Sequence, residues 1–160
     1  MSKFRFILFL KHDLYRFNEL FNLKRTRWIS VFSPRFIPVL ILRISNLFRQ
    51  LKLNPIAKFF SFLNFCFFGI EISNNTFIDH GIFFPHTSGT VIGADKIGKN
   101  CIIFQGVTLG SKYLDSLNTK SSRPIIYDNV TIGAGAKVLG GISISSGTTI
   151  RANSLVTANV

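Results

Sequence analysis

A six-residue repeat of aliphatic residues runs through the second half of the sequence and constrains its fold more than any other feature. From position 126 the repeat is unbroken and comprises Ile126, Ile132, Val138, Ile144, Ile150 and Val156. This period fits neither an α-helix nor the two-residue alternation of a simple strand. It fits a coil of three short strands that each turn one aliphatic side chain inward, and such coils stack into a β-helix. We therefore predict a mainly β fold, a parallel β-helix of hexapeptide repeats, over residues 70–160.

The repeat also extends upstream, with two interruptions. The same spacing links Ile72, Ile78 and Phe84, and again Ile97, Ile103 and Leu109. Ile97 follows Phe84 by thirteen positions, one out of register, and Ile126 follows Leu109 by seventeen. The second gap contains the polar stretch 111–123, which we expect to protrude from the coil as a loop. Loops that project from a rigid repeat are where binding and chemistry usually lie.

Residues 1–69 have a helical pattern. Apolar residues recur at three- and four-residue spacings over 4–21 and 37–51, and we expect a third, more thoroughly buried helix that ends at Phe68. Asn54 is the predicted N-cap of this third helix and Pro55 its first residue. The sequence thus predicts two regions, a helical one over 1–69 and a β-helical one over 70–160.

Charge and aromatic residues concentrate in the helical region. Residues 1–70 hold twelve Lys and Arg against two acids, whereas residues 71–160 hold seven against five. Fourteen of the 18 phenylalanines also lie before position 70, which we interpret as helix packing, with a membrane-facing stripe as the alternative. We find no nucleic-acid-binding motif, and no apolar run reaches the ~18–20 residues of a spanning helix. A nucleic-acid partner is therefore not expected.

The two cysteines, Cys66 and Cys101, fit no metal or redox spacing and have apolar neighbours. We interpret both as buried free thiols in a reducing compartment. No signal-peptide cleavage site follows the basic N-terminus. The prediction is a cytoplasmic protein without a bound metal, with peripheral contact to the inner face of the membrane as a further possibility.

Three motifs follow one another in the β-helical region. They are residues 86–93 (HTSGTVIG), 105–110 (QGVTLG) and 132–140 (IGAGAKVLG). In order and spacing they make residues 35–160 resemble the serine acetyltransferases, a family of hexapeptide-repeat acetyltransferases. The resemblance implies a left-handed parallel β-helix preceded by a small α-helical region. It also implies acetyl-CoA as co-substrate and a homotrimer whose active sites lie between neighbouring subunits.

In the family a histidine is the general base that takes the proton of the acceptor hydroxyl, because a neutral hydroxyl is a poor nucleophile. By its spacing to Gly93 this base is His86, and the carboxylate that orients it falls on Glu71. His80 is a rival, but it lies one hexad before His86 and therefore on a different face. Two alternatives assign no function to these residues. In one, His80 and His86 are both surface histidines; in the other, Glu71 is an ordinary solvated acid.

The family's contacts with acetyl-CoA fall on Gly110, Ser111, Ala134 and Ala152 in this sequence. In this interpretation, backbone N–H groups without bulky side chains approach the pantetheine arm. Small residues are also expected at coil corners for purely structural reasons, because such corners often need a positive φ.

On the acceptor side the sequence departs from the family. Pro85 replaces an acid that binds serine, Arg123 replaces a second histidine, and an acid of the helical region has no counterpart. These departures favour a hydroxyl of a surface-polysaccharide sugar or its precursor as the acceptor, with Pro85 and Arg123 beside it. Serine is the alternative acceptor, because Arg123 could bind its carboxylate. A non-catalytic trimeric scaffold is the second alternative.

Overall fold

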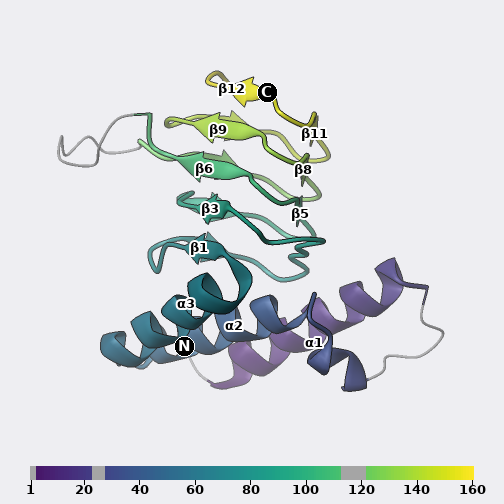
Figure 1. Cartoon of the computed structure of the whole chain (residues 1–160), viewed down its shortest axis with the longest axis vertical. Helices are drawn as coiled ribbons and strands as arrows, with labels where there is room; N and C mark the ends of the chain where they lie inside the picture. Colours follow the sequence, from purple (N-terminus) through teal and green to yellow (C-terminus); the bar gives the residue numbers. More distant parts are fainter. Residues whose placement is uncertain (1–2, 23–27, 113–121) are drawn as a thin grey trace.

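The computed structural model describes residues 3–22, 28–112 and 122–160. Three helices form its base, and a column of β coils stands on them with the C-terminus at the far end (Figure 1). The helices are α1 (Lys3–Leu20), α2 (Ile37–Gln50) and α3 (Asn54–Phe68), and the short 3-10 helix η1 (Trp28–Phe32) precedes α2. Within the described ranges, none of them has the length and apolarity needed to cross a bilayer.

Helix α3 differs from its prediction in two respects. Its N-cap position is Leu53, without a side-chain cap, and Asn54 is already helical. Pro55 lacks an N–H, so one of the amides that a cap would satisfy is absent. The helix is also not thoroughly buried, because its buried side chains are Ala57 and Asn64. Among its large apolar side chains, Phe59, Phe62, Phe65 and Phe67 are exposed by more than half.

The β region is a three-sided prism with one parallel sheet on each side. Sheet A contains β1 (Ile70–Ile72), β3 (Thr90–Ile92), β6 (Thr108–Gly110), β9 (Lys137–Leu139) and β12 (Leu155–Val156). Sheet B contains β2 (Phe77–Ile78), β4 (Lys96–Ile97), β7 (Ile125–Ile126) and β10 (Ser143–Ile144). Sheet C contains β5 (Ile102–Ile103), β8 (Thr131–Ile132) and β11 (Thr149–Ile150). The predicted parallel β-helix is confirmed.

Two corners of the prism are built from residues with positive φ, between 56° and 78°. The corner from sheet B to sheet C, corner BC, contains Gly81, Asn100, Asn129 and Gly147. The corner from sheet C to sheet A, corner CA, contains Gly89, Gly106, Gly135 and Asn153. Glycine and asparagine are the residues that tolerate this conformation best, which explains their recurrence. The third corner, corner AB, follows β3, β6 and β9.

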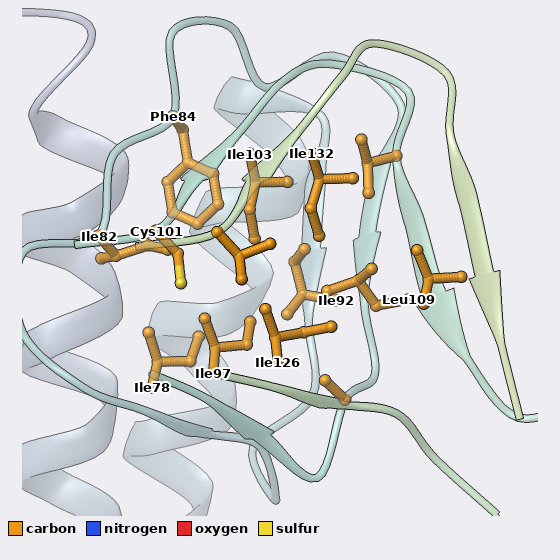
Figure 2. Packing of buried hydrophobic residues seen from close by; sticks show 14 of the residues in the cluster. Ile78, Ile82, Phe84, Ile92, Ile97, Cys101, Ile103, Leu109, Ile126 and Ile132 are labelled. Carbon is orange, nitrogen blue, oxygen red and sulfur yellow. The ribbon is translucent and has the colours of Figure 1, made fainter. Parts of the chain in front are cut away.

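The repeated aliphatic residues fill the prism as three columns. Figure 2 shows Ile78, Ile97 and Ile126 in one column, while Phe84, Ile103 and Ile132 form a second. Ile92 and Leu109 belong to the third, and all of these side chains are at most 2% exposed. Val39 and Leu42 of α2 join the same cluster, so α2 closes the lower end of the column.

The breaks in the repeat fall at corners. The step of thirteen from Phe84 to Ile97 consists of eight residues to Ile92 and five to Ile97, since Ile92 is the inward residue of β3. The first coil thus has two extra residues at corner CA, where His86 lies. The predicted loop 111–123 leaves at corner AB, between β6 and β7, and its residues 113–121 lie outside the described part of the chain.

The two cysteines differ in environment, so the prediction of two buried thiols is wrong for Cys66, which is exposed on α3. Cys101 is buried, and burial raises the pKa of its thiol to about 11. A thiol reacts as its thiolate, so Cys101 is expected to be inert near pH 8. We predict that a disulfide reagent labels one thiol per native chain and a second only after denaturation. Rapid labelling of both thiols in the native protein would contradict this burial.

Candidate active site

The turn that carries His86 is held by the end of α3. Gly69 ends this helix in the left-handed conformation, with φ 60°, and leads directly into β1. The Thr87 hydroxyl donates a hydrogen bond of 2.7 Å to the Phe68 carbonyl, and the Gly89 amide donates one of 2.9 Å to the Gly69 carbonyl. The two extra residues of the first coil are therefore fixed against the helical region.

His86 borders an open groove of about 520 Å³ between this turn and the helical region. Pro85, Thr87 and Ser88 line it on the β side, and Pro34, Arg35, Phe67 and Phe68 line it on the helical side. The His86 side chain is exposed, and the structure shows no hydrogen bond to its imidazole from any described residue. An exposed imidazole at the edge of a groove can accept a proton from a bound hydroxyl.

The strand register places two of the predicted acetyl-CoA contacts on the same corner as His86. Phe83 pairs with Ile102, Ile102 with Thr131, and Thr131 with Thr149. Three residues further along the regular coils are Gln105, Ala134 and Ala152, and their counterpart in the first coil is Ser88, because the two extra residues shift the register. The Gly106 amide donates a hydrogen bond of 3.0 Å to the Ser88 carbonyl, and His86 lies two positions before Ser88 in the same turn. Hydrogen bonds from the Gly135 amide to the Gln105 carbonyl, 2.9 Å, and from the Asn153 amide to the Ala134 carbonyl, 2.8 Å, continue the stack.

The other predicted contacts lie on a different corner. Gly110 ends β6 at corner AB, and Ser111 follows it. The Arg123 guanidinium donates a hydrogen bond of 3.1 Å to the Gly93 carbonyl, which follows β3 at the same corner. Because His86 precedes β3 and Gly93 follows it, the length of this strand separates Arg123 from His86. The predicted site residues of one chain therefore fall into two groups, the predicted half-sites, on corners CA and AB.

Glu71 lies in the middle of β1 and is exposed on the outer face of sheet A, where it pairs in register with Val91. The described residues show no hydrogen bond or ion pair between its carboxylate and His86. The structure therefore places Glu71 near corner CA without the contact that would orient the imidazole, and this role stays a prediction.

His80 lies beneath α1 at corner BC. Its ring stacks on His12 with 4.5 Å between centroids and meets Phe9 edge-on at 5.6 Å. Burial lowers its pKa, which the carboxylate of Asp79 opposes and the neighbouring His12 reinforces. His80 is thus part of the contact between α1 and the first coil and does not line the groove of His86.

Known proteins similar to this chain are serine acetyltransferases. One from Synechococcus elongatus is 38% identical over 128 residues, which is 79% of this chain and 51% of the relative. The structure of the Neisseria gonorrhoeae serine acetyltransferase in complex with serine has a TM-score of 0.83 at 25% identity, covering 99% of this chain and 65% of that one. A serine acetyltransferase in complex with CoA has a TM-score of 0.81 at 26% identity, covering 99% and 65%. No protein-family model matches the sequence.

The chain belongs to the serine acetyltransferase-like family of hexapeptide-repeat acetyltransferases. It spans about half the length of the curated relatives that it matches. Its fold is the left-handed parallel β-helix with preceding helices that these serine acetyltransferases have, as predicted.

The predicted acceptor, a hydroxyl of a surface-polysaccharide sugar, is wrong. Relatives at 38–42% identity and structural neighbours such as the Neisseria gonorrhoeae protein are named serine acetyltransferases. The prediction depended on the residues at two acceptor-side positions, Pro85 and Arg123, and on a missing acid of the helical region. These positions lie on separate corners of the chain, so their identities alone do not define an acceptor pocket.

Two features of this family member fit a CoA thioester along corners CA and AB. Gln105, which stacks between Ser88 and Ala134 at corner CA, has a buried side-chain oxygen without a hydrogen-bond partner among the described residues. The amide N–H groups of a pantetheine arm are donors of the kind that such an oxygen needs. A Cβ built on Gly110 would meet no atom of the described residues within 4 Å, so among these residues its backbone borders open space. The described residues contain no group of three metal-ligating side chains.

The sequence interpretation missed residues that shape this site. Thr87 anchors the turn of His86, and Arg35 and Phe67 form the opposite wall of the groove. The irregular step after Phe84 marks an unusual turn in the sequence, and this could have drawn attention to Thr87. No spacing rule connects Arg35 with His86, because they meet only through the packing of the helical region on the first coil.

Proposed function

We propose that the protein transfers the acetyl group of acetyl-CoA to the hydroxyl of L-serine, with His86 as the general base. Membership of the serine acetyltransferase-like family supports the reaction, and the relatives in complex with serine and with CoA support both substrates. The observation that carries the proposal is the exposed imidazole of His86, which borders a groove and shares a corner with Ala134 and Ala152.

In the proposed reaction, a ring nitrogen of His86 accepts the proton of the serine hydroxyl as its oxygen attacks the thioester carbonyl. A new C–O bond forms, the C–S bond breaks, and the CoA sulfur leaves with the proton that the imidazolium returns. The products are O-acetylserine and free CoA. Glu71 is proposed to orient the imidazole when substrates are bound, because catalytic hydrogen bonds often tighten only in the complex.

The experiment that tests this function is the dependence of CoA release on L-serine. Purified protein is incubated with acetyl-CoA, and free CoA is measured chromatographically so that Cys66 does not interfere with a thiol reagent. We expect release that saturates with L-serine and a much slower release without an acceptor. Equal release with and without serine would contradict the proposal, and no release with any acceptor would favour a non-catalytic scaffold.

We also propose a homotrimer in which corner CA of one copy faces corner AB of the next. This arrangement brings the two half-sites together, with His86, Ala134 and Ala152 from one copy and Gly110, Ser111 and Arg123 from its neighbour. Pro85 and Arg123 would then both border the acceptor. A closed ring of identical contacts is the common result of such a head-to-tail interface.

Two measurements test the trimer. Light scattering is expected to give three times the chain mass of 18.0 kDa. Coexpression of His86→Ala with Gly110→Trp, whose bulky side chain would block the CoA half-site, is expected to restore part of the activity that each variant lacks alone, because one mixed interface then holds both intact residues. A monomer at micromolar concentration, or mixed assemblies as inactive as the separate variants, would contradict the shared site.

Cytoplasmic localisation and peripheral contact with a membrane stay predictions. The basic helical region and the exposed phenylalanines of α3 are the features that support contact with anionic lipid. Cosedimentation with phosphatidylglycerol vesicles, compared with neutral vesicles, tests it.

A further inference from the structure

The groove beside His86 has one fixed charge in its lining. Its residues are Pro34, Arg35, Phe67, Phe68, Gly69, Phe84, Pro85, His86, Thr87 and Ser88. Apart from the histidine, Arg35 is the titratable side chain among them. The lining of this groove therefore offers an acceptor one arginine and no carboxylate, which favours a negatively charged group on the acceptor.

The position of the groove assigns it to the acceptor side of His86. Ala134 and Ala152 lie on the coils that stack above the first coil, away from the helices (Figure 1). The groove lies in the other direction, between the first coil and the helical region. With the donor thioester along corner CA above His86, the space left for the attacking hydroxyl is the groove that Arg35 lines.

An aromatic contact holds the guanidinium of Arg35 at the edge of the groove, against Phe21, which lines the adjoining pocket with Arg35. Its guanidinium carbon lies 5.4 Å from the centroid of the Phe21 ring. Phe21 in turn packs edge-on against Phe83 of the first coil, with 5.8 Å between centroids. The structure shows no carboxylate paired with Arg35 in the described residues. Stacking on an aromatic face leaves the N–H donors at the edge of a guanidinium available for a carboxylate.

We propose that Arg35 binds the carboxylate of the amino-acid acceptor and so determines specificity for serine. This proposal rests on the proposed function and adds to it a residue from the helical region of the same chain as His86. Arg123, which would come from the neighbouring copy, is the competing cation for the same carboxylate.

The test compares L-serine with L-serinamide, which has the same hydroxyl and ammonium but no carboxylate. Arg35→Ala is expected to raise KM for L-serine by about 10-fold or more, the cost of losing a charge-assisted hydrogen bond, while kcat changes little. KM for L-serinamide is expected to stay nearly constant. Arg35→Lys should recover part of the loss, because it restores the charge without the planar fork.

Arg16→Ala is the matched control, since it removes one positive charge from an exposed ion pair with Glu19 on α1, outside the groove. It should leave KM for serine unchanged. An unchanged KM in Arg35→Ala, with the increase found only in Arg123→Ala, would overturn the assignment of Arg35 and leave the proposed function intact.

If the unmodified protein turns over neither acceptor, the proposed function fails, and calorimetric titration with L-serine then decides the role of Arg35. Serine binding that Arg35→Ala weakens would support the assignment. Binding of equal strength in both proteins, or none in either, would overturn it.

Discussion

Replacing His86 by alanine is expected to lower kcat for acetyl transfer by at least about 100-fold, because a positioned general base contributes ~10²–10⁴-fold. The imidazole is exposed and has no hydrogen bond among the described residues, so its removal should not disturb the turn that Thr87 and Gly89 anchor. Initial rates with saturating acetyl-CoA and L-serine measure this effect.

His80→Asn is the control for the loss of a histidine. His80 packs against His12 beneath α1 and does not border the groove, so this variant should keep most of the activity once its folding is verified by circular dichroism. An inactive, folded His80→Asn together with an active His86→Ala would show that the base has been assigned to the wrong turn.

Replacing Arg43 by alanine is expected to destabilise the fold by about 3–5 kcal/mol, the usual cost of leaving one member of a buried ion pair without its partner. Arg43 on α2 is 3% exposed and binds Asp13 of α1, with 2.7 Å between its Nε and the carboxylate. It also donates to the Ile78 and Asp79 carbonyls at 2.7 and 2.6 Å. Asp13 additionally accepts the Gly81 amide at 2.6 Å, so this cluster joins two helices to the first coil.

Chemical denaturation at a fixed protein concentration measures the decrease in the free energy of unfolding. The double variant Asp13→Leu with Arg43→Met should be less destabilised than the sum of its single variants, because it leaves no unpaired charge. Arg16→Ala, which breaks the exposed Arg16–Glu19 pair, should cost no more than about 1 kcal/mol. If Arg43→Ala lowered the free energy of unfolding as little as Arg16→Ala does, the importance of the buried pair would be contradicted.

The β-helix could be predicted because its signal is local and repeated. Each of Ile126, Ile132 and Val138 satisfies the same requirement for one inward aliphatic per strand, and the structure buries all three completely. The same regularity made the irregular turn near His86 visible as a break of one residue, and the structure resolves this break into two extra residues before Ile92 and one fewer after it. By contrast, the spacing of apolar residues does not show how many faces of a helix pack against other parts of the chain. For this reason the exposure of Phe62 and Cys66 on α3 was not predicted.

The site could be predicted in part. Motif spacing separates His86 from His80, and the register brings Ala134 and Ala152 to the corner of His86. The acceptor side depends on packing between distant segments, which the spacing of residues does not encode. Pro85 showed that an acid of the acceptor side is missing, but no spacing of residues indicated that the fold places Arg35 in the groove.

The most direct test of the central claim is the identity of the acetylated product. Acetyl-CoA labelled with ¹³C in the acetyl group is incubated with L-serine, and the products are identified by mass spectrometry with hydroxylamine treatment to detect esters. We expect labelled O-acetyl-L-serine that forms at the rate of CoA release and that is absent from the His86→Ala reaction. Label that appears only in acetate, or that stays in acetyl-CoA while serine remains unmodified, would contradict the central claim.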